Sequence, residues 1–494
     1  MSGSAHEQAG RTVGERAGGT ARESAGGSVR VRRRRGPALR TAAAVLAGVG
    51  LVGALAPVAA AHGAPPSSYG LTVASGAGGD VTGEAVSGGA GAPAGGADAV
   101  ADAGRDVDRG AGRGGVDPAA LDAAVRGLVS PGGASATLGR VSERGRTVWK
   151  GAAGTADLAT SARASADGRF RIGSVTKTFV ATVLLQLVAE HRLGLDDPVE
   201  RHLPGLVPNG GQITVRQLLN HTSGLANYTD DPAFSFEEDT GTLQQWLSTG
   251  RWRSYRPQEL IAIAAKYPPY FAPGQGWHYS NTNYIVAGLL VERLTGRTWG
   301  EEVERRIIRP LGLTGTSMPV DSPFIPGPHA HGYYKLATGP ADATLLNPSM
   351  GGAAGAGIST TADLTRFVSA LLGGRLLGPA ELAEMKRTTP QSGPAEYGLG
   401  LQRTTTPCGE FWGHGGGIPG YNTLLYGTAD GGRQFAASVN PYDMSDLPAT
   451  NAAFETLVAT GTCGGRPPAA AGPLAPPATA AIPSAAGPAP LLLG

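Results

Sequence analysis

The chain has 494 residues, a net charge of +2 and 16% charged residues. A balance this close to neutral argues against a nucleic-acid partner bound through an overall basic field. Glycine and proline are frequent, with 78 and 37 copies, and much of both lies toward the two ends. This leaves roughly 350 residues in the middle, enough for one sizeable core.

The N-terminal stretch has the pattern of an export signal. Residues 30–40, RVRRRRGPALR, are basic, and residues 41–61, TAAAVLAGVGLVGALAPVAAA, form an uncharged run ending in small residues. A transmembrane anchor is the alternative, since a run of this length can span a bilayer. A nucleic-acid-binding arm would leave the apolar run unexplained. We therefore predict an export signal over 1–61 and a secreted protein, which stays at the membrane only if the signal is uncleaved.

Two further segments have compositions that do not support a packed core. Residues 62–115 are glycine, alanine, serine and aspartate with almost no large apolar side chain, which predicts a flexible linker. Residues 466–494 are rich in proline and alanine and carry no charge after Arg466. Because prolines forbid a membrane helix there, we predict a disordered tail.

The first half of the folded region, 116–465, begins with a helix and two strands. Residues 117–129, DPAALDAAVRGLV, start with an aspartate cap and a proline at the first helical position. SATLGRVSE and RTVWKGAAG then read as two strands joined by a short polar turn. The helix after Ser174 is apolar on nearly all sides, which is typical of a central helix. Residues 195–315 read as largely helical, broken by glycine and proline turns.

Strands return in the second half of this region. Residues 359–372, STTADLTRFVSALL, predict a capped helix, and YGLGLQRT, EFWGH and TLLYGT predict strands. Strands at both ends with helices between them indicate an α+β fold, a sheet with flanking helices and a mostly helical subdomain.

Ser174 and Lys177 form a Ser-x-x-Lys pair at the start of the apolar helix. Only five of the 41 basic residues are lysines, and lysine, unlike arginine, can lose its proton in a protein. The spacing places the amine on the same helix face as the hydroxyl, and burial lowers the pKa of a lysine. A neutral amine beside a serine hydroxyl is a working base. The alternative is a capping serine and a lysine whose amine reaches solvent.

A second candidate stretch is GWHYSNTNYIVAGLLVERLTG, residues 276–296. The phenol of Tyr279 and the carboxamide of Asn281 precede an amphipathic helix and can point into one cleft. Taken alone, a Tyr-x-Asn sequence is common and mostly structural.

A third candidate stretch is FWGHGGGIPGY, residues 411–421. His414 is followed by Gly415, Gly416 and Gly417, whose backbone N–H groups are bare for a substrate carbonyl. The alternative is a tight turn, which is the usual reason for a run of glycines.

Together the three motifs resemble those of the penicillin-recognising serine hydrolases. Ser174-Val-Thr-Lys177, Tyr279-Ser-Asn281 and His414-Gly-Gly416 occur in the order and spacing of class C β-lactamases and secreted D-alanyl-D-alanine carboxypeptidases. The likeness covers about 116–465 and implies a β-lactamase/transpeptidase-like fold with an antiparallel sheet. The supporting stretches are ITVRQLLNHTSGL, FAPGQGWHYSNTNYIVAGLLVERLTG, AGAGISTTADLTRF and YGLGLQR.

The resemblance implies a catalytic role for five side chains. Ser174 would be the acylated nucleophile, and Lys177 and Tyr279 would share proton transfer from the serine and to the leaving group. Asn281 would bond the acyl side of the substrate. His414 would occupy the third-motif position, where many relatives have lysine.

The resemblance also implies an oxyanion hole and a disulfide. The backbone N–H groups of Ser174 and Gly417 would bind the oxyanion. Cys408 and Cys463 match paired positions in the carboxypeptidase branch, and an exported protein can form such a bond. The alternative is two unpaired thiols.

The resemblance is incomplete where carboxypeptidases bind the terminal carboxylate of their peptide. The family's arginine is replaced by Gln402, and its hydroxyl positions by Gly415 and Gly417, so these residues would line a substrate site without the usual donors. Arg403 is adjacent, but neighbouring strand residues face opposite sides of a sheet. An aromatic residue of the carboxypeptidase pocket is replaced by Met350.

Several functions remain open from the sequence. The first is a D-alanyl-D-alanine carboxypeptidase or related D-peptidase on cell-wall-type peptides, and the second is an esterase or amidase with another pocket. A β-lactamase and a non-catalytic penicillin-binding sensor are further alternatives. The expected partners are small peptide or ester substrates, with peptidoglycan precursors and β-lactams as candidates, and no nucleic acid.

Two other enzyme classes do not fit the motifs. An α/β-hydrolase requires a G-x-S-x-G sequence, which the chain lacks, and its HGGG motif should precede the nucleophile. The nine histidines include no H-E-x-x-H sequence and there is no cysteine cluster, so we predict no metal and no cofactor.

Overall fold

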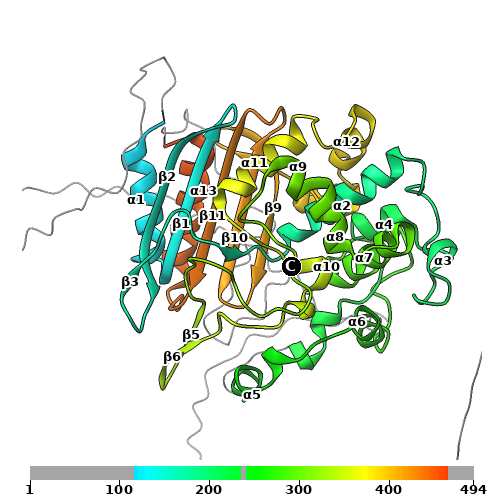
Figure 1. Cartoon of the computed structure of the whole chain (residues 1–494), viewed down its shortest axis with the longest axis horizontal. Helices are drawn as coiled ribbons and strands as arrows, with labels where there is room; N and C mark the ends of the chain where they lie inside the picture. The colour runs from blue at the N-terminus through cyan, green and yellow to red at the C-terminus, as the bar shows by residue number, and fades with distance from the viewer. Residues whose placement is uncertain (1–115, 235–240, 466–494) are drawn as a thin grey trace, which may run out of the picture. The chain divides into compact units, whose positions relative to one another are not determined.

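The computed structural model describes residues 116–234 and 241–465. The signal predicted at 1–61, the linker at 62–115 and the tail at 466–494 lie outside the described residues. Within them, an antiparallel sheet packs between helices, and a mostly helical region adjoins it (Figure 1). The α+β class predicted from the sequence is confirmed.

The main sheet has seven strands in the order β3-β2-β1-β11-β10-β9-β8. The first long strand, β1, pairs antiparallel with the last strand, β11, so the two ends of the described chain close one sheet. Two small two-stranded sheets, β4-β7 and β5-β6, accompany it. The strands are β1 Ala134–Glu143, β2 Arg146–Asp157, β3 Ala162–Arg163, β4 Phe170–Arg171, β5 Tyr333–Leu336, β6 Gly339–Asp342, β7 Ile358–Ser359, β8 Gln402–Thr406, β9 Gly409–Ile418, β10 Tyr421–Thr428 and β11 Arg433–Pro441.

Helices cover both faces of the sheet. Helices α1 and α13 lie on one face, and α2 and α11 lie on the other (Figure 1). No helix in the described ranges is long and apolar enough to cross a membrane. The helices are α1 Pro118–Val129, α2 Val175–Ala189, α3 Val199–His202, α4 Val215–Leu219, α5 Thr242–Ser248, α6 Pro257–Ala264, α7 Asn281–Thr295, α8 Trp299–Val303, α9 Arg309–Leu311, α10 Gly352–Gly355, α11 Thr361–Leu372, α12 Pro379–Lys386 and α13 Leu447–Cys463.

Helix α2 is the central element of the domain. Of its 15 residues, 12 are buried, because apolar side chains occupy nearly its whole circumference. It contributes Phe179, Leu184 and Leu187 to the larger hydrophobic cluster. Polar side chains at the N-terminus of this helix are therefore buried in the protein interior.

The predicted elements are mostly found, with one boundary corrected. The stretch 397–404 was expected to be a strand, but β8 begins only at Gln402. Gly400 has φ +69°, a left-handed conformation that interrupts an extended strand. Strand β11 and helix α13 were not predicted. Strand β11 lies between β1 and β10 in the sheet, and α13 packs on the same face of the sheet as α1.

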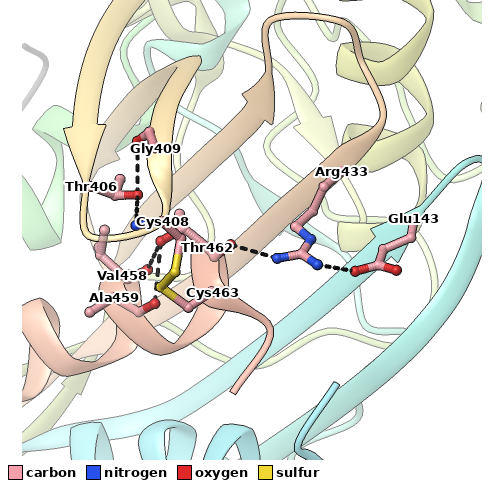
Figure 2. The surroundings of a disulfide bond; sticks show 9 residues. All are labelled: Glu143, Thr406, Cys408, Gly409, Arg433, Val458, Ala459, Thr462 and Cys463. Carbon is pink, nitrogen blue, oxygen red and sulfur yellow. Dashed lines mark hydrogen bonds and ion pairs between the residues drawn. A yellow bond between two sulfur atoms is a disulfide. The ribbon is translucent and has the colours of Figure 1, made fainter. Parts of the chain in front are cut away.

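The predicted disulfide between Cys408 and Cys463 is present (Figure 2). Cys408 lies in the turn between β8 and β9, where its N–H donates to Thr406 Oγ1, and Cys463 ends α13. The bond therefore ties the edge hairpin, which carries the glycine motif, to the last helix. Beside it, Arg433 pairs with Glu143 at 2.5 Å.

Replacing both cysteines, as Cys408→Ser with Cys463→Ser, should lower the free energy of unfolding by about 4 kcal/mol. The bond closes a loop with a sequence separation of 55, which restricts the unfolded chain. Denaturant unfolding of the variant against the oxidised wild type measures the change. Reduced wild type is the control and should match the variant, whereas an unchanged midpoint on reduction would contradict the prediction.

Candidate active site

Ser174 lies at the N-terminus of α2, and its hydroxyl makes no hydrogen bond to the helix backbone. It is the N-cap residue, but its side chain makes no capping hydrogen bond, and it is fully buried. Lys177 is fully buried as well, so its amine does not reach solvent. The alternative of a capping serine beside a solvent-directed lysine is therefore wrong.

The Lys177 amine lies among three oxygen atoms. Its Nζ is 2.8 Å from Ser174 Oγ, 2.6 Å from Asn281 Oδ1 and 2.8 Å from the carbonyl oxygen of Ala354. The amide and carbonyl oxygens can only accept hydrogen bonds, so they take the two N–H groups of a neutral amine. The lone pair is then left to accept the Ser174 hydroxyl proton. This is the geometry that a general base requires.

Burial supplies the protonation state that this geometry needs. Desolvation lowers the pKa of Lys177 well below its usual value. No carboxylate in the described part of the chain pairs with the amine to offset the effect. The neutral amine is thus the form that the interior favours.

Tyr279 lies against the same amine, just before α7. The Lys177 Nζ is 4.8 Å from the centroid of the Tyr279 ring. The Tyr279 hydroxyl is buried, and the Ser174 side chain is the one group in the described ranges close enough to interact with it. Burial raises the pKa of Tyr279, with the neighbouring serine partly offsetting the shift, so the phenol keeps its proton. A protonated hydroxyl that faces only the proposed nucleophile is available to a leaving group.

Asn281 is oriented by partners on both sides of its amide. Its Oδ1 accepts from Lys177, so its Nδ2 points the other way, where it donates to Thr229 Oγ1 at 3.4 Å. Its backbone N–H donates to Asn227 Oδ1 at 3.0 Å. The carboxamide nitrogen therefore points away from the Lys177 amine, and its hydrogen bond to the acyl side of a substrate stays a prediction.

The glycine motif on β9 passes directly beside the nucleophile. A Cβ on Gly416 would lie 3.0 Å from the Ser174 nitrogen and 2.0 Å from the Ile172 oxygen, and one on Gly173 would lie 2.8 Å from the Gly417 nitrogen. Side chains are thus excluded because two backbones touch. This close approach brings together the Ser174 and Gly417 backbones, whose N–H groups were predicted to form the oxyanion hole.

His414 reaches the site but is engaged by other groups. Its Nδ1 bonds the Gly415 carbonyl and its Nε2 lies 2.9 Å from the Tyr397 hydroxyl. Burial lowers the pKa of His414 to about 3. The ring is therefore neutral, with the proton on Nδ1, and Tyr397 donates to Nε2. Its catalytic role stays a prediction.

The residues predicted near the substrate carboxylate provide no cation. Gln402 is buried on β8, and Arg403 pairs with Glu396 and Glu410. Adjacent strand residues face opposite ways, so Arg403 does not substitute for the missing arginine. Met350 is buried, and its carbonyl accepts the Tyr228 hydroxyl at 2.6 Å.

Sequence reasoning missed four groups in this site. The Ala354 carbonyl belongs to the backbone and has no side-chain signal. Thr229, Tyr397 and His221 lie far from the motifs in sequence or carry no assigned role, although His221 and Tyr397 occur in the stretches that support the family resemblance.

Comparison with known proteins places the chain in a family. The β-lactamase family model matches residues 121–458. The chain belongs to the β-lactamase family. A D-stereospecific amidohydrolase from Streptomyces sp. has a similar structure, with a TM-score of 0.61 and 43% identity over 68% of this chain and 97% of that one.

Two curated relatives extend the comparison. Penicillin-binding protein 4* of Bacillus subtilis is 27% identical over 57% of this chain and 63% of its own length. Esterase EstB of Burkholderia gladioli is 36% identical over 35% of this chain and 44% of its own length. The matches thus span less than two thirds of these two relatives.

Lys177→Arg should reduce acylation by a fluorescent penicillin by about 10²–10⁴-fold, because a guanidinium cannot act as the base. Gel fluorescence against time measures the rate. Lys150→Arg is the matched control, since Lys150 lies at the surface beside Asp167 and should tolerate the change. Equal labelling of Lys177→Arg and wild type would remove Lys177 as base.

Acylation should increase with pH and reach its plateau well below pH 10. The neutral fraction of Lys177 rises as pH passes its lowered pKa, and the low pKa of His414 keeps that ring neutral across the range. Second-order acylation rates between pH 5 and 10 test this. A rate still rising at pH 10, or an inflection lost in His414→Asn, would contradict it.

Proposed function

We propose that this protein is a secreted serine hydrolase that acts through an acyl-enzyme on small amides and esters of D-amino acids. In this proposal Ser174 gives its proton to Lys177 as its oxygen attacks the substrate carbonyl. The oxyanion is held by the backbone N–H groups of Ser174 and Gly417. Tyr279 supplies a proton to the leaving amine or alcohol, and water then hydrolyses the ester on Ser174.

One observation carries this choice among acyl-transfer functions: among the residues that the structure describes, the site contains no cation placed to bind a terminal carboxylate. Arg403 is held by two glutamates, and positions 402, 415 and 417 carry a neutral amide and two glycines. A charge-assisted hydrogen bond contributes roughly 1.5–3 kcal/mol. Losing several of them removes orders of magnitude of selectivity for a free carboxylate over an amide or ester.

The relatives support the same substrate class. The Streptomyces structure is named a D-stereospecific amidohydrolase, and the Burkholderia relative is named an esterase. D-alanyl-D-alanine carboxypeptidase activity remains the second candidate, because the acyl-transfer groups fit it and one relative is a penicillin-binding protein. The two candidate functions differ only in whether the substrate ends in a free carboxylate.

Export is supported by the disulfide between Cys408 and Cys463. Such bonds persist in oxidising surroundings and are rare in reducing ones. The predicted signal at 1–61 is consistent with this placement.

Turnover of D-alanine amide, a D-alanine ester and a D-alanyl-D-alanine peptide should rank the amide and ester above the peptide by at least about tenfold in kcat/KM, because the peptide carboxylate gains no partner. The L-enantiomers and Ser174→Ala are the controls. A preference for the free carboxylate would instead establish the carboxypeptidase candidate, and activity retained in Ser174→Ala would reject the acyl-enzyme.

A further inference from the structure

His221 occupies an unusual buried position directly after α4. The residue is fully buried and has φ +63°, a left-handed backbone that is uncommon for any residue but glycine. The preceding Asn220 supports the turn, because its Oδ1 accepts the backbone N–H and hydroxyl of Thr222. Strained conformations of this kind persist where the surroundings hold them, and they cluster at functional sites.

His221 contacts the catalytic turn on both sides of Tyr279. Its carbonyl accepts the His278 N–H at 3.1 Å, and its Nδ1 accepts the Ser280 N–H at 3.2 Å. Its ring stacks on the Tyr279 ring, with centroids 4.2 Å apart and planes at 29°. One residue thus fixes the backbone before and after the phenol as well as the plane of the phenol itself.

The hydrogen bonds of His221 determine its tautomer. The Asn283 Oδ1 accepts the Ser223 hydroxyl at 2.6 Å, so the Asn283 Nδ2 faces His221 Nδ1 at 3.1 Å. With Ser280 and Asn283 both donating to it, Nδ1 carries no proton and the proton is on Nε2. The Nε2–H is buried, with no acceptor in the described ranges, and the Tyr397 ring lies edge-on at 4.8 Å.

The same contacts keep the imidazole uncharged. Protonating Nδ1 would set a third donor against the two that already point at it. Burial also lowers the pKa of His221 well below its usual value. Because Nδ1 is already occupied by two donors, the ring does not take up the proton of the Tyr279 phenol.

We propose that His221 is a positioning residue that holds the Tyr279 hydroxyl where it protonates the leaving group. The proposal rests on acyl transfer at Ser174 as set out under Proposed function. The serine proton passes to Lys177, the Tyr279 proton passes to the leaving atom as its bond to carbonyl carbon breaks, and Lys177 returns a proton to Tyr279. No proton is gained or lost in the acylation step.

This role has a signature that depends on the leaving group. An amide nitrogen must be protonated as it leaves, whereas p-nitrophenolate leaves without a proton. A displaced phenol therefore slows acylation by a penicillin, whose leaving group is an amide nitrogen, and spares acylation by p-nitrophenyl acetate. Misplacing a catalytic group by about 1 Å can cost about 10²-fold in rate.

Two variants separate the two contacts of His221. His221→Asn tolerates the left-handed backbone and keeps an acceptor near the Nδ1 position but removes the ring. His221→Phe keeps a stacking ring but removes the acceptor. The control is His191→Asn, since His191 also has a left-handed backbone, φ +56°, but is exposed.

The experiment compares acylation rates for fluorescent penicillin and p-nitrophenyl acetate. Each rate is expressed per active site that the probe can label. His221→Asn and His221→Phe should each lose about 10²-fold with penicillin and less than about threefold with the ester, as Tyr279→Phe should, while His191→Asn changes neither rate. If one variant fails to fold, as judged by thermal unfolding, the other decides.

Equal losses with both probes, or no loss with either, would overturn the proposal. Each variant is compared with wild type on the same probe, so the result does not depend on the natural substrate. A protein that fails to turn over D-alanine amide yet shows the leaving-group difference would reject the proposed substrate class and keep the role of His221.

Discussion

The contact between an uncharged amine and a serine hydroxyl in a dry interior is the interaction on which the site depends. Lys177 has no carboxylate partner in the described ranges, and a buried ammonium without one is costly. The interior avoids that cost by favouring the neutral amine. Asn281 Oδ1 and the Ala354 carbonyl then take its two protons and leave its lone pair to Ser174.

Three separate elements must meet for this contact to operate. Helix α2 supplies the serine and the lysine, the turn before α7 supplies the phenol and the carboxamide, and β9 supplies the glycine backbone. Contacts outside the reacting groups fix each element. Helix α2 is fixed by the packing of its apolar side chains, and the turn before α7 by His221. The β8–β9 hairpin is fixed by the disulfide (Figure 2). The chemistry is therefore preorganised by packing that lies outside the reacting groups.

Acyl transfer and substrate recognition depend on different parts of this architecture. The groups proposed to transfer protons lie on α2 and just before α7, whereas the positions expected to bind a carboxylate lie on β8 and β9. Gln402, Gly415 and Gly417 replace the carboxylate-binding donors of the carboxypeptidases, while the Ser-x-x-Lys and Tyr-x-Asn motifs are kept. The proteins that this chain resembles include a penicillin-binding protein, an esterase and a D-stereospecific amidohydrolase, and such a separation allows substrates to differ while the acyl-transfer groups stay the same.

The family, the α+β class and the cysteine pair were predicted from the sequence through the resemblance that its three motifs carry, and these predictions are confirmed. A resemblance of this kind can be read from the sequence because each motif, such as Ser-x-x-Lys, is a short local pattern. The sequence did not predict β11, α13, the contact of the Ala354 carbonyl with Lys177, or the contacts of His221 on both sides of Tyr279. Only the tertiary structure revealed them, since their partners lie far away along the chain. The protonation states of Lys177 and His414 were likewise decided by burial, which depends on how all the elements pack together.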